Sequence, residues 1–79
     1  MKESKTLEAQ RAAHLELERA TTDYGPFVSY HEGYAVLLEE VDELWDEVKK
    51  KPSERDPVKI KKEAVQVAAM ALRFLVDLC

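Results

Sequence analysis

The sequence contains few of the residues that turn or crosslink a chain. Among its 79 residues there are one cysteine, two glycines and three prolines. A fold of many β-strands needs more turn residues than this, which argues against β-sandwiches, β-barrels and glycine-rich phosphate-binding loops. The single cysteine, Cys79, has no partner for an intrachain disulfide, and no cysteine–histidine cluster has the spacing of a structural zinc site. We therefore interpret Cys79 as a reduced thiol.

Excess positive charge and long apolar runs are also missing. The chain has 12 basic and 16 acidic residues, for a net charge of −4. A surface that binds nucleic acid is normally a basic stripe, so this balance argues against a nucleic-acid partner. No window approaches the roughly 18 uninterrupted apolar residues of a membrane span. The charged residues 1–5 lack the apolar core of a signal peptide, and we expect a cytoplasmic protein.

An ordinary apolar content is packed into a short chain. Hydrophobic residues make up 46% of the sequence, which is too high for a disordered tail. Residues 1–79 form one domain, since a second domain would need roughly 100 more. A core of this size supplies only about 3–5 kcal/mol, and neither a disulfide nor zinc adds to it. We therefore expect the chain to associate with copies of itself, as a homodimer or homotetramer.

Three helical segments separated by two breaks are predicted. The first, from about Lys5 to Thr21, is rich in good helix formers but has only a weak apolar stripe. The second, from about Phe27 to Lys50, has apolar residues at steps of three and four, the strongest periodic signal in the chain. The third runs from about Pro57 to Leu78, with Asp56 as its N-cap and proline at its first position.

The third segment is apolar around most of its circumference. Such a helix must be covered on more than one side, which a single hairpin partner cannot do. The expected fold class is therefore all-α: an antiparallel helical hairpin with an extra N-terminal helix, completed as a helical bundle by oligomerisation. On its polar stripe, Arg73 and Asp77 are four residues apart and are expected to pair. The aromatic residues expected to pack in the core are Phe27, Tyr30, Tyr34 and Trp45.

Acidic residues stand at matching heights on the second and third segments. Counting outward from the middle of the connection, near residues 53–54, brings Glu40 and Glu43 level with Glu63 and Gln66. Converging carboxylates repel one another unless a cation neutralises them, and hard divalent ions such as Mg²⁺ or Mn²⁺ prefer oxygen ligands. Many glutamate-rich helix faces are simply solvated, in which case the chain would be a plain helical oligomerisation module.

The acidic pattern resembles that of the MazG-like all-α nucleoside triphosphate pyrophosphatase superfamily. Its members have a helix with Glu-Glu-x-x-Glu, followed after a short connection by a helix with Glu-x-x-Asp. The first motif is intact at Glu39–Glu43, and the second reads Glu-Ala-Val-Gln at Glu63–Gln66. The apolar run at 67–72 also matches. The resemblance covers about residues 27–78, with the N-terminal helix in residues 1–23.

The resemblance implies a Mg²⁺-dependent hydrolase that converts a (deoxy)nucleoside triphosphate into the monophosphate and pyrophosphate, as in nucleotide-pool housecleaning. By resemblance, Glu40, Glu43 and Glu63 are the catalytic metal ligands. Gln66 stands where the family has aspartate, and its amide oxygen can ligate a cation but brings no charge. The alternative is therefore a non-catalytic MazG-like helical oligomer that binds a nucleotide or a protein through a degenerate metal site.

Four further residues are candidates for substrate binding. Tyr24 and His31 lie outside the apolar stripe, near the region where the resemblance implies the base pocket, and aromatic rings can stack on a nucleobase. Lys59 and Lys62 flank the polar stripe about one turn before the second acidic motif, where they could attract a polyphosphate. The competing interpretation is that these lysines belong to a solvated helix end.

Overall fold

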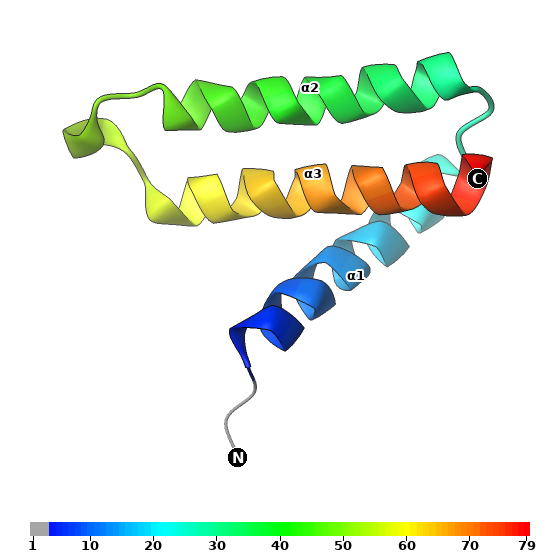
Figure 1. Cartoon of the computed structure of the whole chain (residues 1–79), viewed down its shortest axis with the longest axis horizontal. Helices are drawn as coiled ribbons and strands as arrows, with labels where there is room; N and C mark the ends of the chain where they lie inside the picture. Colours follow the sequence, from blue (N-terminus) through cyan, green and yellow to red (C-terminus); the bar gives the residue numbers. More distant parts are fainter. Residues whose placement is uncertain (1–3) are drawn as a thin grey trace.

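The computed structural model describes residues 4–79 and contains three α-helices (Figure 1). Helix α1 spans Lys5–Tyr24, α2 spans Tyr30–Val48 and α3 spans Pro57–Leu78. A short 3₁₀ helix, η1 (Pro52–Glu54), lies between α2 and α3. The residues described include no β-strand, and the all-α prediction is confirmed. Within residues 4–79, none of the helices is both long and apolar enough to cross a membrane.

Each α-helix begins after a residue whose side chain accepts a hydrogen bond from a backbone N–H of the first turn. These N-caps satisfy donors that have no partner within the helix, and they are Ser4, Ser29 and Asp56. At the start of α3, Asp56 Oδ1 accepts from the Val58 N–H at 2.9 Å. Pro57 occupies the first helical position, where its missing N–H is not needed. The predicted start of the third helix is confirmed.

The first helix is longer than expected. It continues through Thr21 to Tyr24, although β-branched residues were expected to end it. The hydroxyl of Thr22 donates to the Glu18 carbonyl at 2.9 Å, so this side chain bonds within the helix instead of competing with it. Gly25 then ends the helix with φ 69°, a left-handed conformation that glycine adopts without strain.

The second helix is shorter than expected. It begins at Tyr30, because Ser29 is extended and serves as its N-cap, and it ends at Val48 instead of Lys50. Phe27 therefore lies in the connection between α1 and α2, where its side chain is buried. Phe27 continues the apolar periodicity of the second segment, but it packs in the core from the connection and not from the helix.

Helix α3 is the central element and packs against both α2 and α1. Figure 1 shows α2 and α3 side by side in opposite directions, with α1 crossing α3 obliquely. A Cβ at Gly33 of α2 would lie 2.7 Å from Phe74 Cδ2 and 2.8 Å from Leu78 Cδ1, so glycine permits this close approach. The buried hydrophobic residues are few and mostly small: Ala13, Ala20, Phe27, Ala69 and Met70.

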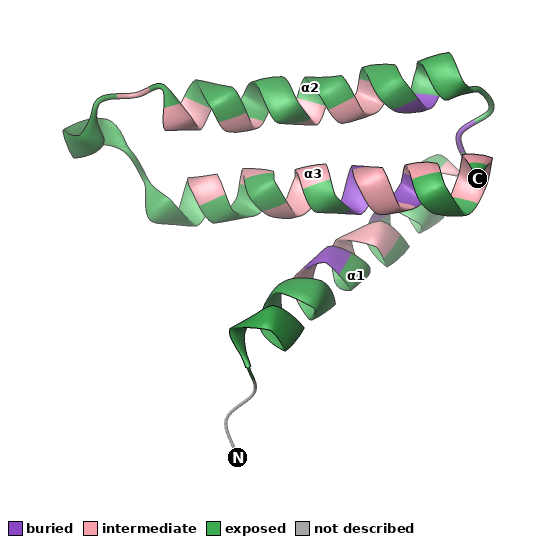
Figure 2. Ribbon diagram, viewed as in Figure 1, coloured by how far each residue is buried: buried purple, intermediate pink, exposed green. Residues whose placement is uncertain are grey.

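The aromatic residues of α2 are not core residues of a single chain. Tyr30, Tyr34 and Trp45 are each more than half exposed, and only Phe27 of the four expected core aromatics is buried. Figure 2 shows exposed residues along the length of α2. The three aromatic side chains are exposed because α3 covers only one side of the apolar stripe of α2. The core prediction is therefore wrong for these three residues within one chain.

Candidate functional site

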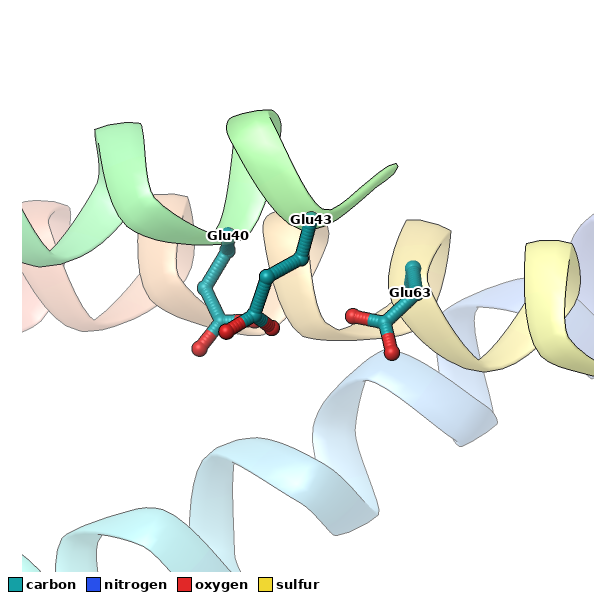
Figure 3. Close-up of side chains that lie close together, drawn as sticks. All are labelled: Glu40, Glu43 and Glu63. Atoms are coloured by element: carbon teal, nitrogen blue, oxygen red, sulfur yellow. The ribbon is translucent and has the colours of Figure 1, made fainter. Parts of the chain in front are cut away.

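Three carboxylates from two helices converge beside α1. Glu40 and Glu43 are three residues apart on α2 and share a face, and the tight connection through η1 brings Glu63 of α3 to their level. One carboxylate oxygen of each lies within 4.8 Å of the others. Figure 3 shows Glu40 and Glu43 extending from α2 toward Glu63, on the side of the hairpin where α1 crosses. We call these three residues the acidic cluster.

Two members of the acidic cluster, Glu40 and Glu63, have raised pKa values. Burial, together with the charge and hydrogen bond of Glu43, raises the pKa of Glu40 to about 7. Burial also raises the pKa of Glu63, and the hydrogen bond and charge of Glu43 add to this. The Oε2 atoms of Glu40 and Glu63 are buried without a hydrogen-bond partner among the described residues. Buried oxygens without donors are unfavourable, so these side chains fit a hard divalent cation.

Gln66 lies one turn beyond Glu63 on α3 and interacts with Glu16 of α1. The pKa of Glu16 is lowered mainly by hydrogen bonds from Arg19, and secondarily by one from Gln66. An ionised carboxylate can only accept, so it favours the amide N–H of Gln66 and leaves the carbonyl oxygen as the atom that can ligate a cation. Glu16 could not be identified from the sequence, because the weak apolar stripe of α1 does not show which face packs against α3.

A cavity of about 440 Å³ opens next to the acidic cluster. Glu40 belongs to both, since its side chain also lines the cavity. The cavity lies between α1, the connection that follows it, α2 and α3. Its lining combines aromatic, cationic and amide groups, including Arg19, Tyr24, Phe27, Gln66 and Arg73. Of the two aromatic candidates from the sequence, Tyr24 therefore lies at this cavity.

Arg73 holds the connection between α1 and α2. It is only 4% exposed, and one of its terminal nitrogens donates to the Gly25 carbonyl at 2.6 Å. Its guanidinium lies 4.1 Å from the centre of the Phe27 ring. The predicted pair with Asp77 is wrong, because Asp77 Oδ2 accepts from the Phe27 N–H at 2.9 Å. Both side chains instead form hydrogen bonds with the connection between α1 and α2. The Arg73 Nε is buried without a hydrogen-bond partner in residues 4–79.

The other candidate substrate-binding residues are not brought together. His31 lines a shallow hollow near the end of α3, with Asp77 and Leu78, and not the cavity beside the cluster. The charge of Lys62 opposes the upward shift of the Glu63 pKa, so this ammonium lies within electrostatic reach of the cluster. Lys59 is exposed and belongs to neither the cluster nor the cavity.

Comparisons with models of protein families, with curated proteins and with solved structures each find no match to this chain. The functional interpretation therefore depends on the acidic cluster, the adjoining cavity and the resemblance of the two motifs.

Proposed function

We propose that this chain is a metal-dependent nucleoside triphosphate pyrophosphohydrolase. It would convert a (deoxy)nucleoside triphosphate of the cytoplasmic pool into the monophosphate and pyrophosphate, a housecleaning reaction. The observation that carries the proposal is the convergence of Glu40, Glu43 and Glu63, two of which have buried carboxylate oxygens without a partner. The resemblance of Glu39–Glu43 and Glu63–Gln66 to the MazG-like motifs supports it.

The proposed ligands of Mg²⁺, or of Mn²⁺, are the three carboxylates and the carbonyl oxygen of Gln66. When bound, such an ion polarises phosphate oxygens and lowers the pKa of a water. Glu40 has a pKa of about 7, so at neutral pH its carboxyl group exchanges a proton readily in the metal-free protein. Cation binding would favour the charged form of each carboxylate and would displace that proton.

The cavity beside Glu40 is the proposed place of the nucleoside. Its volume of about 440 Å³ is within the usual range for small-molecule sites. Tyr24 offers exposed aromatic surface for the base, and Lys62 can attract the phosphates toward the cluster. Lys59 and His31 stay predictions with less support, because neither lines this cavity.

A second candidate function follows from Gln66. Replacing a charged ligand by a neutral amide weakens the attraction of the site for a cation and removes a possible base. The chain would then be a non-catalytic MazG-like oligomer that binds a nucleotide or a protein. Because the cavity does not depend on the charge at position 66, nucleotide binding would survive the loss of turnover.

The test is turnover of a panel of nucleoside and deoxynucleoside triphosphates with Mg²⁺ or Mn²⁺, following pyrophosphate and monophosphate together. Equimolar products that disappear in Glu43→Gln, but persist in the exposed neighbour Asp42→Asn, would support the enzyme. Absence of turnover with either metal in a folded protein would contradict it. A rise in melting temperature with nucleotide alone would then favour the binding protein, and indifference to nucleotide and metal would favour a plain scaffold.

We also propose that the helical hairpin is completed as a bundle by association of copies, as a homodimer or homotetramer. In the part of the chain that is described, no large side chain is fully buried. Twelve large hydrophobic residues are instead exposed, from Leu7 to Val76. A domain with so little core gains stability most directly by covering such surface with a second chain.

A further inference from the structure

Arg73 has hydrogen-bond donors that the described chain does not use. A guanidinium has five N–H groups, and only two of those of Arg73 have a partner, the Gly25 carbonyl and the Met70 sulfur. The Nε is buried without a partner, and the ion pairs within residues 4–79 do not include this side chain. A positive charge that is only 4% exposed is unfavourable unless another group satisfies it.

Arg73 lines the cavity beside the acidic cluster. Gln66 and Met70 also line it, and the spacing of four and then three residues places all three on one face of α3. At 1.5 Å per residue, Gln66 lies about 4.5 Å from Glu63 along the helix axis, whereas Arg73 lies about 15 Å from it. Arg73 therefore stands at the end of the cavity that is farther from the acidic cluster.

This separation decides which part of a nucleotide meets Arg73. The inference rests on the proposed function in one respect, that the phosphates are held by a cation at the acidic cluster. Phosphates held there stay near Glu63, so the group that enters the far end of the cavity is the nucleobase. The charges agree, because Glu32 and Glu40 also line the cavity and would repel a phosphate inside it, but not a neutral base.

The unused donors of Arg73 distinguish bases by their acceptors. One N–H remains on each terminal nitrogen, and two such donors side by side match the O6 and N7 acceptors of guanine. Adenine has an amino group in place of O6, and the exocyclic amino group of cytosine is also a donor. A base that presents a donor leaves the buried guanidinium unsatisfied, which gives strong discrimination.

Two neighbouring side chains suit the same ligand. Glu32 Oε1 accepts from the Val28 N–H at 3.0 Å, which leaves Oε2 as an acceptor for the N1–H or the 2-amino group of guanine. The Phe27 ring centre lies 4.1 Å from the guanidinium carbon of Arg73. Because this ring covers one face of the guanidinium, the N–H edge is the part left for a ligand.

We propose that Arg73 determines the base specificity of this site. Its unused N–H groups bind a 6-oxopurine, guanine or hypoxanthine, in preference to adenine or cytosine. The observation that carries the proposal is a buried guanidinium in the cavity wall with three of its five donors unused. Tyr24 remains the stacking surface, and the acidic cluster remains the place of the phosphates.

The first test is calorimetric titration of the full chain with Mg²⁺ and the α,β-methylene analogues of dGTP and dATP, which cannot be cleaved between the α and β phosphates. The guanine analogue should bind at least about 5-fold more tightly, the low end for a bidentate contact with the right base. Equal affinities, tighter binding of the adenine analogue, or no binding of either would overturn the proposal.

Turnover separates this proposal from the proposed enzyme. A guanine preference in binding, without release of pyrophosphate from dGTP, would support the base assignment and contradict the enzyme. Equal kcat/KM for dGTP and dATP would support the enzyme and overturn the base assignment.

Arg73→Lys tests the residue itself. Lysine keeps the charge and a donor for the Gly25 carbonyl but loses the paired N–H groups, so the variant should fold and bind both analogues about equally. Arg19→Lys is the matched control. Arg19 lines the same cavity, but its guanidinium is held by Glu16 and Asp23, so the guanine preference should persist. Circular dichroism checks folding, and a preference that Arg73→Lys leaves unchanged would overturn the proposal.

A second measurement uses only the wild-type chain, so that it does not depend on a variant that folds. Monophosphates compete with the bound guanine analogue in the presence of Mg²⁺. We expect 7-deaza-dGMP, which lacks the N7 acceptor, to compete about 3- to 10-fold less well than dGMP. We expect dIMP, which keeps O6 and N7, to compete better than dAMP. Equal competition by dGMP and 7-deaza-dGMP would overturn the two-acceptor contact.

Discussion

Two sides of the same helix, α2, are incomplete in opposite ways. On the side where α1 crosses, Glu40 and Glu43 join Glu63 in a cluster with buried oxygens that lack partners. On the other side, five large apolar side chains are exposed. The first side lacks positive charge and the second lacks apolar cover. Both deficits lower the stability of a chain with so small a core. Each indicates the chemistry of the group that would satisfy it.

The comparison also shows why the two sides can change independently. Charge repulsion in the cluster is relieved by protons or by a cation, and neither affects the exposed apolar area on the other side of α2. Covering the exposed apolar side chains would bury carbon, which is insensitive to Mg²⁺. Substitutions on one side should therefore leave the property of the other side nearly unchanged, because distant sites contribute almost additively.

The largest expected effect is on turnover. Glu43→Gln keeps the shape of the side chain but removes the charge of the carboxylate that interacts with both Glu40 and Glu63. We expect a loss of at least about 100-fold in kcat/KM with Mg²⁺, measured by release of pyrophosphate. The metal-free variant should melt at the same or a higher temperature than the wild type, since a like charge is gone. Retained activity would show that the cluster is not catalytic.

The next effect concerns the packing that holds both sides in place. Gly33→Ala would put a methyl group 2.7 Å from Phe74 and 2.8 Å from Leu78, closer than carbon atoms tolerate. We expect the free energy of unfolding to fall by about 1–3 kcal/mol, measured by urea denaturation. Ala35→Gly is a useful contrast, because Ala35 is exposed on the same helix and should lose only about 1 kcal/mol of helix propensity. Without the clash, alanine would stabilise the helix, so a Gly33→Ala variant at least as stable as the wild type would argue against the close approach of α2 and α3.

The acidic cluster should also make stability depend on pH. Glu40 and Glu63 have pKa values above those of the unfolded chain, so the folded protein binds more protons. The stability of the metal-free protein should therefore fall as pH rises from about 4.5 to about 7. Because Glu40 is only partly buried, we expect about 1–2 kcal/mol after solvent screening. Glu16, whose pKa is lowered, acts in the opposite direction, but only at lower pH.

Thermal melts across this range would check the pH dependence, with and without Mg²⁺. Saturating metal should flatten the curve or reverse it, because cation binding favours the charged carboxylates. Glu40→Gln should remove most of the slope of the metal-free protein. A slope that this variant leaves intact would assign the titration to another group.

Much of the secondary structure follows from local rules in the sequence. The Asp56–Pro57 start of α3 was predictable, because a cap and a proline at the first position act within one turn. The end of α1 was not predictable. The hydrogen bond from the Thr22 hydroxyl to the Glu18 carbonyl offsets the low helix propensity of this β-branched residue. The start of α2 was predicted too early, at Phe27. The apolar side chain of Phe27 continues the helical spacing of apolar residues, although Phe27 lies before the helix.

The residues of the candidate site also differ in how far they could be predicted from the sequence. Glu40, Glu43 and Glu63 could be grouped from the sequence, because spacing within a helix and a short connection determine their heights. The roles of Glu16 and Arg73 could not, since both depend on where α1 and the connection at 25–27 cross α3. The separation of His31 from the cavity depends on the rotation of α2 against α3, which is set by packing around Gly33.

The smallest effect should distinguish two neighbouring lysines on α3. The charge of Lys62 reaches Glu63 and Glu16, whereas Lys61 lines a separate hollow between α1 and α3. If Lys62 attracts the phosphates, Lys62→Ala should raise KM about 3- to 5-fold with little change in kcat, as expected for a single exposed charge. Lys61→Ala should leave both constants unchanged. The difference should shrink at high ionic strength, because exposed charges are screened, and a difference that persists at 0.5 M salt would require direct contact with the substrate.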